Sequence, residues 1–124
     1  MIAQKFFSEE RRKALRLINN IPLKISQEEG DIVTETLNIS RSGAYCRVNR
    51  FIKPMVKLRV DFLLPLRKGG KNLSRKISCS GVVVRTEPVD NQKYFNVAIF
   101  FNDIDKKDAD CITEYVSSHF GRSQ

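Results

Sequence analysis

Apolar and polar residues alternate in short runs along most of the chain, and a period of two residues predicts β-strands with one buried face. The run at 55–64 shows this most clearly, because Val56, Leu58 and Val60 fall on one face and charged residues fall on the other. Turn-forming residues separate the runs, and the glycine pair in 67–72 predicts one such turn. The pattern predicts six strands, at residues 21–25, 31–40, 44–48, 55–64, 77–87 and 94–101.

Near the C-terminus the apolar period changes from that of a strand to that of a helix. The helical spacing is carried by Ala109, Ile112, Val116 and Phe120. We expect Asp105 to be the N-cap, because a carboxylate there accepts hydrogen bonds from unpaired backbone N–H groups, and Gly121 to end the helix. Six short strands at regular spacing followed by one helix predict a small barrel or sandwich, with the helix covering an open side or edge.

The second run ends in the sequence NISRSG, residues 38–43. Its alternation predicts that Thr34, Thr36 and Asn38 share one face of the strand, and Ser40 continues that face. Asn38 offers both a donor and an acceptor, which suits a base edge. Gly43 permits either a left-handed turn or a close approach of the backbone to a ligand. Alone, the stretch is equally typical of a strand that ends in a polar turn.

Composition fits one soluble domain spanning 1–124. The formal net charge of +8 favours an anionic partner, but it does not choose among nucleic acid, a nucleotide and an acidic membrane surface. Neither a signal peptide nor a membrane-spanning apolar run is evident, so we expect no membrane insertion.

Chemistry typical of enzymes is lacking in the sequence. Cys46, Cys79 and Cys111 are far apart, do not have metal-ligand spacing, and are expected to be small apolar fillers in a reducing, cytoplasmic protein. His119 is the single histidine, which leaves no recognisable catalytic triad. We therefore expect no catalysis, no metal site and no cofactor.

Arginines gather upstream, in the stretch from Glu10 to Arg16. Arg12 and Arg16 are four residues apart, about 6 Å along a helix or about 13 Å along a strand, so both can point at one ligand. A guanidinium can bind guanine O6 and N7 as a pair and can also clamp phosphate oxygens. On its own, however, this stretch is better explained as a solvated basic arm, with Glu9 and Glu10 as partial partners.

Together the two stretches resemble the signature of the PilZ domain family, RxxxR followed some twenty residues later by [DN]xSxxG. The first motif is Arg12 to Arg16 and the second is Asn38 to Gly43. Further stretches resemble the family's strands, so the likeness extends from Glu10 onward: LINNIPLKI, PMVKLRVDFLLPL, GVVVRTEP and YFNVAIFFNDI.

PilZ domains are β-barrels that bind the bacterial second messenger cyclic di-GMP. The resemblance therefore implies a mainly β fold, a six-stranded antiparallel PilZ-type barrel at 19–104, with an N-terminal arm at 1–18 and a C-terminal helix at 105–120. In this picture cyclic di-GMP orders the arm, and the protein signals to an unidentified protein partner that controls motility, biofilm or exopolysaccharide.

The resemblance also assigns ligand contacts by position. It implies that Arg12 and Arg16 contact guanine and phosphate, that Asn38 and Ser40 contact the guanine edge or ribose-phosphate, and that Gly43 keeps the backbone clear of the ligand.

Some family members bind an intercalated ligand pair and stack an extra arginine on a guanine, a role that would fall to Arg11. Arg41 is a lesser candidate because of its strand parity. The chain departs from the family with Ala98 in place of the usual Gly and Phe100 in place of a polar residue, which bears on packing at that edge.

Two alternatives stay open at this point. One is a PilZ-like adaptor that works without nucleotide, supported by the apolar last strand and the C-terminal helix. The other is a basic β-barrel that binds single-stranded nucleic acid, supported by the charge and by aromatics such as Tyr45, Phe51 and Tyr94. Nucleic acid is disfavoured because the arginines cluster in one arm.

Overall fold

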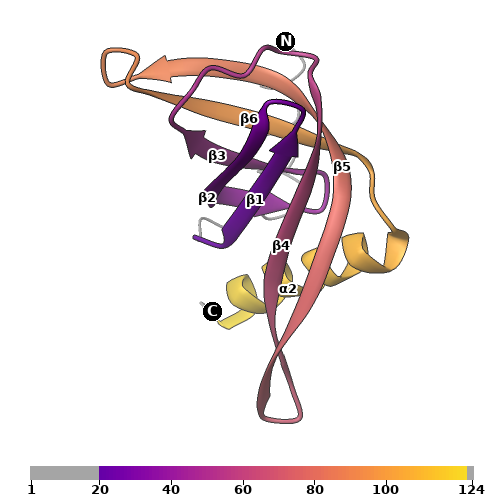
Figure 1. The fold of residues 1–124 in the computed structure, drawn as a ribbon. Helices are drawn as coiled ribbons and strands as arrows, with labels where there is room; N and C mark the ends of the chain where they lie inside the picture. Colours follow the sequence, from indigo (N-terminus) through magenta and orange to yellow (C-terminus); the bar gives the residue numbers. More distant parts are fainter. Residues whose placement is uncertain (1–19, 123–124) are drawn as a thin grey trace.

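A computed structural model of the chain describes residues 20–122, with side chains as far as His119. Within this range the chain forms a six-stranded barrel followed by one helix, and the strand order around the barrel is β1-β2-β3-β6-β5-β4 (Figure 1). The elements are β1 (Pro22–Gln27), β2 (Gly30–Ser40), β3 (Gly43–Val48), β4 (Lys57–Lys68), β5 (Lys71–Val89), β6 (Tyr94–Asp103) and α2 (Lys106–Arg122). The predicted fold class is confirmed.

All neighbouring strands are antiparallel. Four hairpins follow the chain, and two further pairings close the ring, β1 with β4 and β3 with β6. Each of the six predicted runs lies within or overlaps a strand. The run expected to begin at Met55 begins later, at Lys57, because Met55 has a φ of 76°, which is incompatible with extended backbone.

The barrel is filled by the apolar face that the alternation predicts. Ile32 is buried while its neighbour Val33 is 78% exposed, as expected for a half-buried strand. Cys46 and Cys79 are core residues, which confirms their predicted role as apolar fillers. Burial raises the pKa of both thiols to about 12, so they are poor nucleophiles at neutral pH.

Helix α2 lies below β1 and β2 in Figure 1 and adds Ile112, Tyr115 and Val116 to the same core. The predicted N-cap is confirmed, because Asp105 Oδ1 accepts a hydrogen bond from the Lys107 N–H at 2.8 Å. The helix continues to Arg122, two residues beyond the predicted end at residue 120, so the predicted stop at Gly121 is wrong.

A β-bulge in β2 makes one prediction wrong, the common face of Thr34, Thr36 and Asn38. The register between β2 and β3 shifts between Thr36 and Asn38, so these two residues do not share a face as expected. Thr36 points into the barrel and is fully buried, whereas Ile39 takes the next inward position. Because Ile39 faces the core, Asn38 and Ser40 both lie on the outer face of the sheet, and their predicted common face is retained. Ser40 is nevertheless buried, with 2% of its surface exposed, and Asn38 is half-buried.

Thr36, inside β2, binds the residue that precedes β1. Its Oγ1 accepts a hydrogen bond from the Ile21 N–H at 2.9 Å, and its own N–H donates to the Ile21 carbonyl. We expect Thr36→Val to lower the free energy of unfolding by about 1–3 kcal/mol, because the buried Ile21 N–H loses its acceptor. Urea denaturation measures this. Thr34→Val is the comparison, because it removes an exposed hydrogen bond to the Arg47 carbonyl, and an equal loss there would contradict the special role of Thr36.

Candidate functional site

The NISRSG stretch forms the tight connection between β2 and β3. Ser40 pairs with Gly43, and the intervening residues make a turn in which Ser40 Oγ accepts a hydrogen bond from the Ser42 N–H at 3.2 Å. The Ser42 carbonyl accepts in turn from the Phe101 N–H at 2.8 Å, which ties the turn to β6. The turn therefore holds Asn38 and Ser40 on a rigid strand end.

Gly43 does not form the left-handed turn that was one of its two predicted uses. Among the described residues, positive φ angles occur at other glycines and at Met55, Asp90, Asn91 and Gln92, but not at Gly43. Gly43 is buried and lies between Ser40 of β2 and Phe100 of β6. A close approach of the backbone to a ligand stays a prediction.

Asn38 carries an unusual feature for a strand residue. Its Oδ1 atom is buried and has no hydrogen-bond partner in the structure. A buried amide oxygen without a donor costs roughly 1–3 kcal/mol relative to one that is paired, so such an atom calls for an explanation. A ligand with N–H donors, placed on the outer face of β2, would supply the missing partner.

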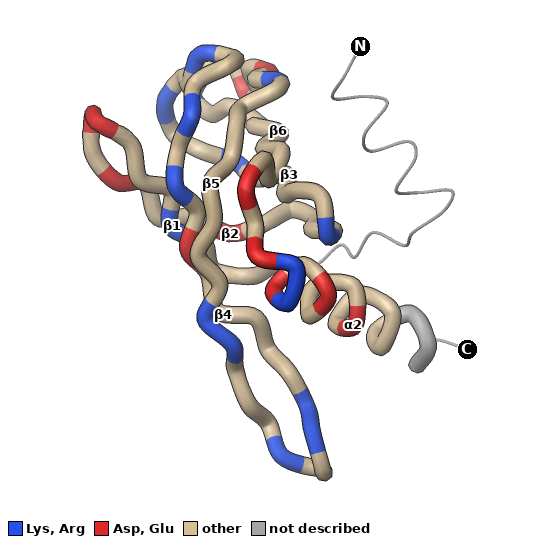
Figure 2. The backbone as a smooth tube through the Cα atoms, turned by 90° about the vertical axis from the view of Figure 1, so that its right-hand side faces the viewer, with Lys and Arg blue, Asp and Glu red and all other residues tan. Residues whose placement is uncertain are grey.

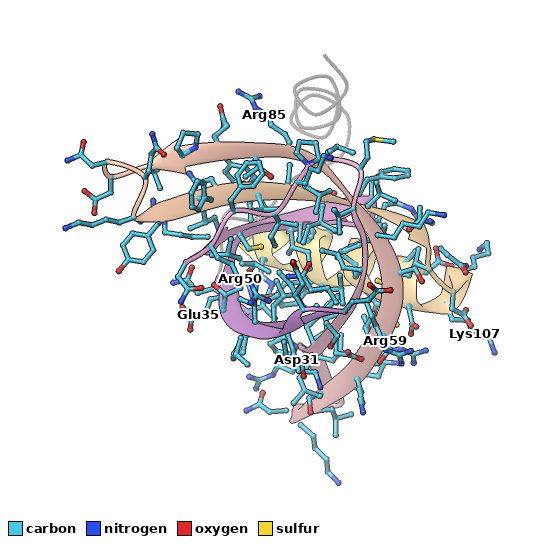
Figure 3. The ribbon with its side chains drawn as sticks, turned by 45° about the horizontal axis from the view of Figure 1, so that its top comes forward. Asp31, Glu35, Arg50, Arg59, Arg85 and Lys107 are labelled. Atoms are coloured by element: carbon cyan, nitrogen blue, oxygen red, sulfur yellow. The ribbon has the colours of Figure 1, made fainter. Side chains whose placement is uncertain are left out.

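The strand register sets other polar residues beside Asn38. Asn38 pairs with Tyr45 of β3, and Tyr45 pairs on its other side with Ala98 of β6. Ala98 pairs in turn with Arg85 of β5. Side chains directly opposite each other in a sheet share a face, so these four form one row across the outside of the barrel. Figure 3 shows Arg85 pointing away from the barrel.

Glu87 joins two members of this row. Its carboxylate accepts a hydrogen bond from Tyr45 Oη at 3.1 Å and forms an ion pair with Arg85. Burial first, and then the hydrogen bond to Glu87, raise the pKa of Tyr45, so its hydroxyl stays protonated at physiological pH. Arg85 and Glu87 were absent from the sequence-based candidates, because only the pairing of four strands brings them to Asn38.

Arg41 has a structural partner. Its Nη1 donates to Asp110 Oδ1 at 3.0 Å and to Thr113 Oγ1 at 2.7 Å, so it ties the β2–β3 turn to α2. Lys106 and then Arg41 lower the pKa of Asp110, which keeps that carboxylate charged. Because Asp110 and Thr113 already bind its guanidinium, Arg41 is a weaker candidate for a ligand contact, as the sequence predicts.

The structure places one half of the predicted site. Arg11, Arg12 and Arg16 lie outside the described residues, so their assignment as ligand contacts stays a prediction. Within residues 20–122 no group of three or more His, Cys, Asp or Glu side chains could hold a metal ion. In the same range, α2 is neither long nor apolar enough for a membrane span.

Solved structures with a similar fold are found among known proteins. Among solved structures, the inhibitor of motility MotI/DgrA of Bacillus subtilis is 20% identical, has a TM-score of 0.76, and is matched over 88% of this chain. The match covers 51% of that chain, so the present chain spans about half of its length. The PilZ domain of CeSA from a cellulose-synthesising bacterium is 14% identical and has a TM-score of 0.52. This match covers 88% of the present chain and 98% of the CeSA domain.

No curated protein matches the sequence. The family model of the PilZ domain matches residues 10–118, which is most of the chain and includes both motifs. With the six-stranded barrel and the outward pair of Asn38 and Ser40 in place, the conclusion is that this chain belongs to the PilZ domain family.

Proposed function

We propose that this PilZ protein is a cytoplasmic receptor for cyclic di-GMP that signals to a partner protein. The observation that carries the proposal is the buried, unpartnered Oδ1 of Asn38, on the same outer face as Ser40. Guanine presents N–H donors along its edge, and an amide oxygen held on a rigid strand is a matching acceptor. Asn38 would thus read a base of the ligand.

The arm would supply the charge that the ligand needs. Cyclic di-GMP carries two phosphates and two guanines, and Arg12 and Arg16 offer guanidinium forks for both groups. Arg11 is proposed to stack on a guanine if two ligand molecules bind as an intercalated pair. The net charge of +8 favours the approach of such an anion.

The proposed switch uses two parts of the site, a strand end held by the barrel and an arm that the ligand would order. Asn38 and Ser40 lie on a strand whose following turn is fixed to α2 by Arg41. The arm, residues 1–18, would become ordered when its arginines meet the ligand on that strand, and the ordered arm would form a new surface for a partner. Ligand can shift this equilibrium only by its difference in affinity for the two states.

The nature of the output is suggested by the relatives. One is an inhibitor of motility and one is a domain from a cellulose-synthesising bacterium, which supports an output in motility or surface polysaccharide. A nucleotide-independent adaptor is the second candidate, and the exposed Leu63 and Leu73 of the β4–β5 hairpin favour it because they suit a protein contact.

Titration calorimetry of the purified chain tests the proposal. We expect saturable binding of cyclic di-GMP and at least tenfold weaker binding of cyclic di-AMP, because adenine lacks the O6 acceptor and the N2 donors of guanine, roughly 1–3 kcal/mol of discrimination. A ratio of two ligands per chain would support stacking by Arg11, and a ratio of one would count against it. Equal affinity for both dinucleotides, or no binding of either, would refute the proposed function.

A further inference from the structure

The hairpin of β4 and β5 extends well beyond the barrel, as a finger at the bottom of Figure 1 and Figure 2. Phe62 and Ile77 form the last strand pair with both side chains in the core, and we define the finger as residues 63–76 beyond that pair. Neither strand has a second neighbour here, since β4 pairs with β1 only between Arg59 and Phe62 and β5 pairs with β6 only from Ser80.

The charge of the finger is of one sign. No Asp or Glu occurs from Phe62 to Thr86, whereas the finger itself has five basic residues. They are Arg67, Lys68, Lys71, Arg75 and Lys76. Arg75 is neutralised by Asp108 of α2 at 2.9 Å, which fixes the base of the finger to the helix. The other four form no ion pair with any residue that the structure describes, and three of them, Arg67, Lys68 and Lys71, gather at the tip.

The tip is a tight turn centred on Gly69 and Gly70, and both glycines are exposed. Gly69 and Gly70 have φ angles of 57° and 78°, as in the two-residue hairpin loop that favours positive φ at both central positions. A Cβ atom added at either glycine would meet no atom within 4 Å. The turn presents Arg67, Lys68 and Lys71 to solvent.

Apolar side chains lie behind the charged tip, on both faces of the ribbon. Leu73 pairs with Leu66 on the face that carries Leu64, and it is 49% exposed. Leu63 pairs with Lys76 on the opposite face and is 56% exposed. A two-stranded ribbon is only marginally stable in water by itself. On each of its faces a half-exposed leucine is available to pack against a side chain of an added strand.

From these observations we propose that the finger is a docking element for an acidic, extended segment of a partner protein. The unpaired cations complement its carboxylates, the leucines take up its apolar side chains, and the open strand edges offer backbone hydrogen bonds to an added strand. The same cations disfavour pairing between two copies of the finger, because charged edge strands repel. This inference does not depend on nucleotide binding.

The order of residues along the finger argues against two other anionic surfaces. Insertion into a membrane would require the charged tip to enter the lipid before the leucines could reach it. A flat bilayer would also contact only one of the two leucine faces. Nucleic acid would satisfy the cations, but it would leave Leu63 and Leu73 against phosphates and water.

The test uses the full chain and a defined probe, a fluorescent ten-residue peptide of alternating Glu and Val. Fluorescence anisotropy should show saturable binding that the triple variant Arg67→Glu, Lys68→Glu, Lys71→Glu weakens at least about tenfold, if each reversal costs roughly 0.5 kcal/mol or more. The matched triple Lys24→Glu, Lys53→Glu, Lys57→Glu changes the net charge equally on the exposed barrel surface and should weaken binding by less than about threefold.

A second variant separates the partner classes. Leu63→Ser with Leu73→Ser should weaken peptide binding and leave the thermal midpoint unchanged, because both side chains are exposed. The same proteins are titrated with vesicles of phosphatidylglycerol and phosphatidylethanolamine (3:7) and with a 20-base-pair DNA duplex. Equal losses in the two triple variants would overturn the proposal. So would no peptide binding by the parent, or finger-dependent binding to vesicles or DNA that exceeds binding to the peptide.

Discussion

Asn38→Leu is expected to reduce affinity for cyclic di-GMP about ten- to a hundred-fold while making the ligand-free protein more stable. The loss follows from removing an amide that reads a base edge, roughly 1–3 kcal/mol. The gain follows because leucine has nearly the shape of asparagine but leaves no buried Oδ1 without a donor, which is worth about 1 kcal/mol. Calorimetry measures the first effect and urea denaturation the second.

Two further variants sharpen this prediction. The Asn38→Asp variant should still bind cyclic di-GMP, because a carboxylate accepts hydrogen bonds from the same guanine donors. Asp is also the other residue that the motif [DN]xSxxG allows at this position. Asn49→Leu, on the exposed loop after β3, should change neither affinity nor stability. A fall in stability for Asn38→Leu would mean that Oδ1 already has a partner in the free protein, and the argument for an unpartnered acceptor would be wrong.

Arg12→Ala and Arg16→Ala should each weaken cyclic di-GMP binding about ten- to a hundred-fold, the cost of one guanidinium fork on guanine or phosphate. Urea denaturation should show that both variants fold like the parent, so that the loss of affinity is a loss of ligand contacts. Hydrogen exchange at residues 1–18 should slow on addition of ligand in the parent and not in these variants.

Arg41→Ala is the matched control for the arginine variants. Its guanidinium is engaged by Asp110 and Thr113, so its loss should change affinity by less than about threefold and stability by no more than about 1 kcal/mol, as for other exposed ion pairs. If Arg12→Ala and Arg16→Ala both bind ligand like the parent, the arginines are not part of the site.

Local patterns were enough to predict much of this protein. The alternation in each run predicts six strands and their buried faces, because a half-buried strand must place every second residue in the core. The C-terminal spacing predicts the helix, and Asp105 predicts its start, because a capping hydrogen bond spans only two residues. The common face of Asn38 and Ser40 is likewise a two-residue property, and it holds.

What depends on pairing between distant strands was not predicted. The bulge that separates Thr36 from Asn38 exists only relative to β3, and the row that brings Tyr45 and Arg85 to Asn38 requires the registers of four strands. Residues 67–72 were expected to form a turn, but β4 and β5 continue through most of them.

The sequence by itself thus determined the elements, their inner faces and the two motifs, since these follow from contacts a few residues apart. Tertiary structure alone decided that Asn38 has a buried oxygen without a donor and that Arg41 is held by α2. It also decided that the β4–β5 hairpin extends beyond its pairing with β1 and β6. The physical reason is that burial, ion pairing and strand ends are set by residues far apart in the chain, whose meeting depends on barrel closure.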